Sequence, residues 1–245
     1  HGKGVAWAGR ALSVPVRVHV PRSVDQAKLT GIKRLGAEVV VSPVDGYDET
    51  EGIAEADARA CGLPFISAYE DDAIRAGNGG TLVLELLDQL PDFAAVATPL
   101  SGGGLAAGMA VALDARRPGV ELWACQHEDS ASLAVSLARG EAATSLPPIK
   151  TLAGGLEGGI GALNFAMLAE RVSGVATVSE QALKRAVVWA LDAHQLLIEP
   201  SGAAALAAIL EGKLPRSPGA LVVVLTGRNL ALRTLRGILS ELTTP

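Results

Sequence analysis

Residues 93–104, Phe93-Ala94-Ala95-Val96-Ala97-Thr98-Pro99-Leu100-Ser101-Gly102-Gly103-Gly104, form an apolar strand pattern that runs into three glycines. An Ala-rich helical stretch follows directly and continues through Gly108. Glycines let the backbone come close to an anion, and the start of a helix offers free amide donors and a favourable dipole. We therefore interpret Ser101, Gly102, Gly103 and Gly104 as a phosphate-binding loop. The alternative is a tight strand-to-helix turn with no ligand.

Strand and helix patterns alternate on both sides of this loop, which predicts βαβ units. The fold class is therefore α/β, with two open, mostly parallel sheets flanked by helices. We expect a small lobe over residues 1–67 and a large lobe over residues 68–245. Three local features are also expected: a capping box between Ser23 and Gln26, a turn at 77–80 and helix caps at Asp129 and Ser130. The expected strands are 14–20, 38–42, 63–67, 93–98, 119–125 and 220–225.

Composition narrows the class of protein. The chain has 245 residues, 49% of them hydrophobic, so it can bury a substantial core. Its net charge is −5 and no basic stripe is visible, which argues against nucleic acid as a partner. Cys61 and Cys125 lie far apart, which argues against a disulfide framework or zinc site. We find no membrane-spanning run and no signal peptide, and we expect a cytoplasmic protein.

Two further segments point to the same edge of the predicted sheet. In Glu199-Pro200-Ser201-Gly202-Ala203, Pro200 suits the first position of a helix and Glu199 lies at its positive end. The buried strand 221–225 is followed by Thr226 and Gly227, and ligands of open α/β sheets bind beyond the carboxyl ends of strands. We therefore expect a phosphate-binding loop, a hydroxyl and a carboxylate at strand ends of one sheet.

A dinucleotide site is an alternative interpretation. Gly102, Gly104 and Gly108 imitate its glycine spacing, and Glu128 lies near the end of the next strand, where a ribose-binding acid would be. This interpretation gives no role to Glu199 or Thr226 and their neighbours. An NAD(P)-dependent oxidoreductase therefore ranks well behind.

In combination, these segments resemble the fold-type II pyridoxal-phosphate enzymes, which share a fold with the tryptophan synthase β subunit. The resemblance is to the threonine/serine dehydratase and serine racemase group, and it covers the whole chain. Residues 1–6, His1-Gly2-Lys3-Gly4-Val5-Ala6, resemble the helix start that follows Ser-x-Gly-Asn in this family. Residues 101–104 resemble its glycine loop, residues 199–203 its Glu-Pro-x-Gly-Ala segment and residues 226–229 its Ser-Gly-Gly-Asn turn.

The resemblance implies a cofactor, pyridoxal 5'-phosphate, and roles for these residues. The glycine loop would hold the phosphate, and the Thr226 hydroxyl would meet the pyridine nitrogen. Gly227 would also belong to the cofactor site, and Glu199 would lie near the nitrogen side of the ring. The backbone amides at His1 and Gly2 would receive the carboxylate of an amino-acid substrate. A hydroxyl at the pyridine nitrogen makes the ring a weaker electron sink than a carboxylate would, which favours expulsion of a β-leaving group.

The implied activity is that of an ammonia-lyase, which converts L-threonine or L-serine to a 2-oxo acid and ammonia by β-elimination. A serine racemase, another amino-acid racemase or a threonine synthase-like enzyme is the alternative, and a homo-oligomer, a dimer, is expected. The Schiff-base lysine of the family would lie in a segment upstream of His1, so no catalytic residue is assigned within the chain. An inert fragment therefore also has to be considered. Where some members begin a cation site with Glu-Pro, this chain has Gln126 and His127, and no metal is expected.

Overall fold

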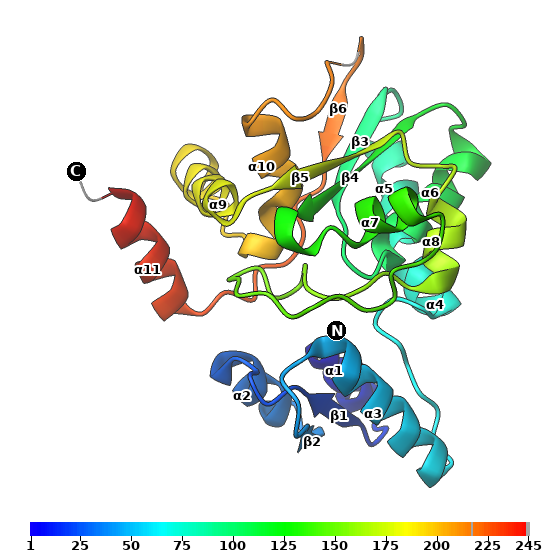
Figure 1. Ribbon diagram of the computed structural model, residues 1–245, viewed down its shortest axis with the longest axis vertical. Helices are drawn as coiled ribbons and strands as arrows, with labels where there is room; N and C mark the ends of the chain where they lie inside the picture. The colour runs from blue at the N-terminus through cyan, green and yellow to red at the C-terminus, as the bar shows by residue number, and fades with distance from the viewer. Residues whose placement is uncertain (217, 244–245) are drawn as a thin grey trace. The chain divides into compact units, whose positions relative to one another are not determined.

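The computed structural model describes residues 1–216 and 218–243, and it divides the chain into two compact units (Figure 1). The small unit comprises His1–Ala68 and the large unit Tyr69–Pro245. Each unit contains a parallel sheet with helices on both faces. This arrangement confirms the predicted α/β class with parallel sheets flanked by helices.

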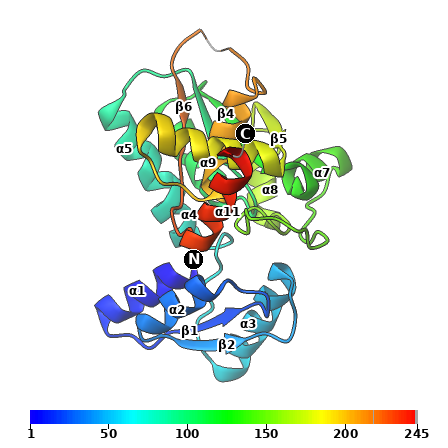
Figure 2. The same ribbon diagram turned by 90° about the vertical axis from the view of Figure 1, so that its left-hand side faces the viewer.

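The small unit consists of α1 (Gly2–Leu12), β1 (Arg17–Val20), α2 (Gln26–Arg34), β2 (Glu38–Val41) and α3 (Tyr47–Cys61). The strands β1 and β2 run side by side and parallel (Figure 2). Val18 and Val20 pack with Ala6 of α1 and Ile32 of α2 on one face of this sheet. Because successive strand residues point to opposite faces, His19 faces the other side. There its ring Nε2 lies 3.0 Å from Asp57 of α3.

Two expectations for the small unit were wrong. The carboxylate of Asp25 caps α2, because it accepts the amides of Ala27 (2.8 Å) and Lys28 (3.3 Å). The expected capping box is not formed, and Ser23 instead donates its hydroxyl to a backbone carbonyl 3.1 Å away. Residues 63–67, all within the described chain, are irregular rather than a strand. Pro64 interrupts that segment, and a proline has no amide to donate to a neighbouring strand.

The sheet of the large unit has the strand order β5-β4-β3-β6, and all pairs are parallel. Its strands are β3 (Ala95–Pro99), β4 (Glu121–His127), β5 (Gly174–Val178) and β6 (Leu221–Val223). One face carries α5 (Thr81–Gln89), α6 (Gly104–Arg116), α7 (Ser132–Arg139) and α8 (Ala162–Leu168) (Figure 1). The other face carries α9 (Glu180–His194) and α10 (Ala204–Leu210), and α11 (Leu232–Thr243) packs against α9. Strand β5 was not among the expected strands.

Both faces of this sheet are buried. Val96 and Leu122 belong to the core under α6, whereas Ala97 and Cys125 belong to the core under α9 and α10. Strands that are covered on both sides have no polar face, so their sequences are continuous apolar runs. This explains why β3 could be recognised in the sequence.

The expected turn at 77–80 was also wrong. Helix α4 (Asp72–Arg75) continues through a π-helical segment, η1 (Ala76–Gly80), into α5. The glycines here serve close helix packing, because a Cβ on Gly79 would overlap the Leu105 carbonyl of α6. Conversely, a Cβ on Gly108 would overlap the Arg75 carbonyl. Gly108 therefore has a structural reason, and the dinucleotide interpretation loses one of its three glycines.

Candidate functional site

Two of the predicted motifs meet because their strands are neighbours. Strands β3 and β6 pair in parallel, with Ala97 opposite Val223, and the amide of Val224 donates to the Ala97 carbonyl (2.9 Å). The carboxyl ends of parallel strands lie at one edge of a sheet. The glycine loop at 101–104 follows β3 and the segment 226–227 follows β6, so both lie at the same edge.

The glycine loop ends in free amide groups at the start of α6. Gly103 is the N-cap residue, has a φ of +88°, and provides no side-chain cap. The first helical hydrogen bond runs from the Ala107 amide to the Gly103 carbonyl (2.8 Å), so earlier amides have no partner within the helix. Within the described residues, the amides of Gly103, Gly104 and Leu105 have no protein acceptor. These donors and the 13-residue helix behind them suit an anion such as a phosphate.

The segments around Glu199 and Thr226 interlock. The amide of Glu199 donates to the Gly227 carbonyl (3.0 Å), and the Glu199 carboxylate covers the place where a Gly227 side chain would be. A Cβ on Gly202 would overlap the Thr226 carbonyl. Glycine is therefore required at both positions, and it is required at Gly227 also because its φ is +42°. The hydroxyl-bearing residue Thr226 is half-buried beside this contact.

A third segment, residues 153–161, connects these motifs and was missed as part of the site. The Ser101 hydroxyl donates to the Glu157 carbonyl (2.6 Å). The amide of Gly155 donates to the Ser201 hydroxyl (2.9 Å) at the start of η3 (Pro200–Ala203). The sequence contained a signal for this role, because five of these nine residues are glycine. Glycine-rich irregular segments commonly mark places where two backbones come close together.

Gln126 caps α7 in place of the residues expected to do so. Its side-chain oxygen accepts the amides of Leu133 (3.1 Å) and Ala134 (3.2 Å) at the start of that helix. The expected caps at Asp129 and Ser130 were therefore wrong, because the buried Gln126 reaches these amides from the end of β4.

The described part of the chain contains no group of three or more His, Cys, Asp or Glu side chains that could hold a metal ion.

His1 and Gly2, the predicted contacts of a substrate carboxylate, begin α1 of the small unit. The His1 ring lies 3.1 Å from the Ile66 carbonyl through its Nε2 atom. A Cβ on Gly2 would come within 2.7 Å of a methyl of Val18, so this glycine lets α1 lie close to β1. Their role toward a substrate stays a prediction.

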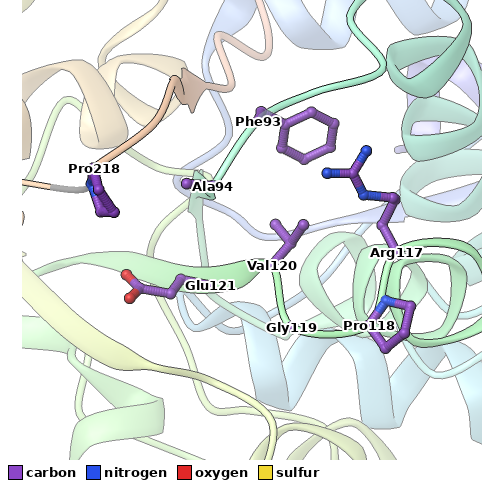
Figure 3. A pocket seen from close by; sticks show the side chains of 8 residues that line it. All are labelled: Phe93, Ala94, Arg117, Pro118, Gly119, Val120, Glu121 and Pro218. Carbon is purple, nitrogen blue, oxygen red and sulfur yellow. The ribbon is translucent and has the colours of Figure 1, made fainter.

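A surface cavity of about 340 Å³ lies at the opposite edge of the large sheet, beside the amino ends of β3 and β4 (Figure 3). The Arg117 guanidinium lies over the Phe93 ring, 6.0 Å from its centre, and donates to Asp92 (3.1 Å). Because the charge of Arg117 is already paired, we assign no site to this cavity.

Every helix within residues 1–216 and 218–243 is too short or too polar to cross a lipid bilayer.

Comparison with known proteins identifies one family. Residues 1–227 match the model of a family described as "Pyridoxal-phosphate dependent enzyme".

Two curated relatives match nearly the whole chain. An L-threonine ammonia-lyase of Geobacter sulfurreducens is 33% identical over 236 residues, which are 96% of this chain and 58% of that protein. A serine racemase of Arabidopsis thaliana is 30% identical over 240 residues, which are 96% of this chain and 72% of that protein. The chain thus spans less than two thirds of the length of the ammonia-lyase.

Solved structures give the same result. The crystal structure of a T.th. threonine deaminase has a TM-score of 0.84 and 34% identity, covering 95% of this chain and 75% of that one. Maize serine racemase has a TM-score of 0.87 and 28% identity, covering 98% of this chain and 74% of that one. These matches decide against the dinucleotide interpretation. The chain belongs to the family of pyridoxal-phosphate-dependent enzymes, and its cofactor is pyridoxal 5'-phosphate.

Proposed function

We propose that this chain is part of an ammonia-lyase that deaminates L-threonine or L-serine to a 2-oxo acid and ammonia. One observation carries the proposal. The free amides at the start of α6 and the Thr226 hydroxyl follow the paired strands β3 and β6, so both lie at the same edge of the sheet. The similarity to L-threonine ammonia-lyases, at 33% and 30% identity, supports it.

The residues at this edge fit the cofactor. The amides of Gly103, Gly104 and Leu105 would hold its phosphate, because they are unpaired donors at the positive end of α6. The Thr226 hydroxyl would face the pyridine nitrogen, and Glu199, which is held over Gly227, would be the neighbouring carboxylate. When bound, pyridoxal phosphate withdraws electrons from the α-carbon of an amino acid and so makes the α-proton acidic.

The neutral hydroxyl of Thr226 determines the kind of reaction in this proposal. A hydroxyl can hydrogen-bond a ring nitrogen but does not stabilise a proton on it, whereas a carboxylate would. A weaker electron sink favours prompt departure of the β-hydroxyl over a long-lived carbanion. We assign the base that removes the α-proton to no residue of this chain. Within the large unit, the amines of Lys184 and Lys213 are paired with Glu241 and Glu211.

Racemisation is the second candidate, because serine racemases are nearly as similar to this chain as L-threonine ammonia-lyases are. The Arabidopsis thaliana enzyme is 30% identical, as is the Thermotoga maritima L-threonine ammonia-lyase. Both reactions begin with removal of the α-proton and differ in whether the β-hydroxyl leaves.

The expected homodimer and the expected cytoplasmic location stay predictions.

The test is product analysis with the complete protein and pyridoxal phosphate. We expect L-serine and L-threonine to give 2-oxo acid and ammonia in equal amounts, with little D-isomer. Thr226→Ser keeps the hydroxyl and should retain this product ratio, whereas Thr226→Asp should shift it toward the D-isomer. D-serine as the main product of the unaltered protein would support the racemase, and the absence of any reaction with bound cofactor would refute both.

A further inference from the structure

Two buried polar side chains lie directly behind the glycine loop. Asn164 of α8 has no exposed surface, and Arg75 of α4 is 6% exposed. The Asn164 Nδ2 donates to the carbonyls of Gly102 (2.7 Å) and Tyr69 (2.9 Å), and Arg75 Nη1 donates to Asn164 Oδ1 (3.0 Å). A hydrogen-bonded path therefore runs from the guanidinium to the loop backbone. All of these residues belong to the large unit.

Arg75 fixes which way the Asn164 amide points. A guanidinium has only donors, so the oxygen of the amide must face it. The NH₂ group then faces the two carbonyls, which can only accept. A flipped amide would set donor against donor at Arg75 and oxygen against oxygen at Gly102. In a site without exposed surface, both mismatches would go unrelieved by water.

Asn164 in turn fixes the peptide between Gly102 and Gly103. The Gly102 carbonyl accepts from Asn164 and also from the Gly161 amide (3.1 Å). Because this peptide is trans, its carbonyl and its N–H point in opposite directions. Holding the carbonyl toward Asn164 therefore turns the Gly103 N–H away from Asn164. A Cβ on Gly103 would lie 2.9 Å from the Asn164 Cβ, which makes glycine necessary there.

Arg75 also places a buried positive charge behind the loop. Its side chain is 8% exposed, and its acidic partner, Asp72, is 97% exposed. Water screens the carboxylate far more than the guanidinium, so the guanidinium field toward the loop is only partly cancelled. Its sign favours an anion at the start of α6.

We propose that Arg75 and Asn164 are positioning residues that set the affinity of the glycine loop for the cofactor phosphate. This inference rests on the proposed phosphate site. Neither residue touches the cofactor in this proposal. Asn164 holds the loop peptide, and Arg75 holds Asn164.

The experiment compares two ligands of the complete protein, pyridoxal phosphate and pyridoxal, which lacks the phosphate. The ratio of their dissociation constants isolates the phosphate contribution. Asn164→Asp keeps an oxygen toward Arg75 but loses the donors to Gly102 and Tyr69 and adds a negative charge behind the loop. We therefore expect the preference for pyridoxal phosphate to fall by about tenfold or more, since losing the one buried hydrogen bond to the loop already has an effect of this size. The phosphorus NMR signal of the bound cofactor should shift in the same variant.

Arg171→Met is the matched control. Arg171 is also a largely buried arginine, its side chain being 18% exposed, and it donates to the Val120 carbonyl (3.0 Å) just before β4. This contact lies at the amino ends of the strands, whereas the glycine loop lies at their carboxyl ends. We expect this variant to lose stability but to keep the ligand ratio.

The outcomes are separable. An unchanged ratio in Asn164→Asp would overturn the positioning role while leaving the phosphate site intact. Equal affinities of the unaltered protein for the two ligands would instead overturn the phosphate site. If Asn164→Asp does not fold, Arg75→Lys and Arg75→Met decide. Lysine keeps a donor and the charge and should preserve most of the preference, whereas equal loss in both variants would contradict the proposal.

Discussion

Gln126, at the end of β4, offers a sharp test of the geometry beside the loop. Its side chain has no exposed surface and is hydrogen-bonded at both ends. The oxygen accepts the Leu133 and Ala134 amides, and Nε2 donates to the Ser132 hydroxyl (3.1 Å) and the Leu100 carbonyl (3.4 Å). Ser132 gives its own proton to another carbonyl, that of Ser101, so its oxygen can only accept from Gln126.

Gln126→Glu keeps the shape and replaces the NH₂ donor by an oxygen. When ionised, that oxygen would face two acceptors without water, whereas the protonated acid would imitate the amide. The folded-state pKa of the new carboxyl should therefore rise above its unfolded value of about 4.3. Stability is then full below that pH and is lost as the pH rises toward the folded-state pKa. With a folded-state pKa above about 7, the loss is about 1.4 kcal/mol per pH unit, or roughly 2.7 kcal/mol between about pH 5 and pH 7.

Urea denaturation of the variant and the unaltered protein over this pH range measures the difference directly. A chelator in the buffer prevents a cation from pairing with the new carboxylate. Gln126→Met is the control, because it removes both the donor and the oxygen that caps α7 without adding a titratable group. Its loss of about 2–4 kcal/mol, from several buried hydrogen bonds, should not depend on pH. A difference between Gln126→Glu and the unaltered protein that stays flat from about pH 5 to pH 7 would refute this account of Gln126.

Three further predictions concern packing and ionisation. Gly79→Ala should destabilise the large unit by about 1–3 kcal/mol, because the new methyl would overlap α6, whereas Gly77→Ala, with open space around it, should stabilise by about 0.5–1 kcal/mol in urea denaturation. Burial raises the pKa of the Cys125 thiol to about 12, so this cysteine should resist alkylation until the chain unfolds. The exposed Cys61 should be alkylated at once in the folded protein. The Arg17 guanidinium lowers the pKa of Asp57. The stability that this carboxylate gives the small unit is therefore present above about pH 4 and is lost as the pH falls. Asp57→Asn should abolish this loss of stability in acid.

The sequence allowed three of the four parallel strands of the large unit, β3, β4 and β6, to be recognised, because strands covered on both faces are apolar throughout. It also allowed the segments after β3 and β6 to be expected at one edge, because that follows from parallel pairing. The helix–helix contact at Gly79 could not be seen, since a glycine that admits another helix has the same sequence as one that makes a turn. Asn164 and Arg75 were missed for a similar reason. A single polar residue in a helix gives no sign of which distant backbone it contacts.

A crystal structure of the complete protein with bound pyridoxal phosphate would show whether the start of α6 holds the cofactor phosphate. We expect the phosphate within hydrogen-bonding distance of the amides of Gly103, Gly104 and Leu105, with the Gly102 carbonyl turned toward Asn164. A bound cofactor whose phosphate lies elsewhere, or a loop whose amides all donate to the protein itself, would rule out a phosphate site at the start of α6.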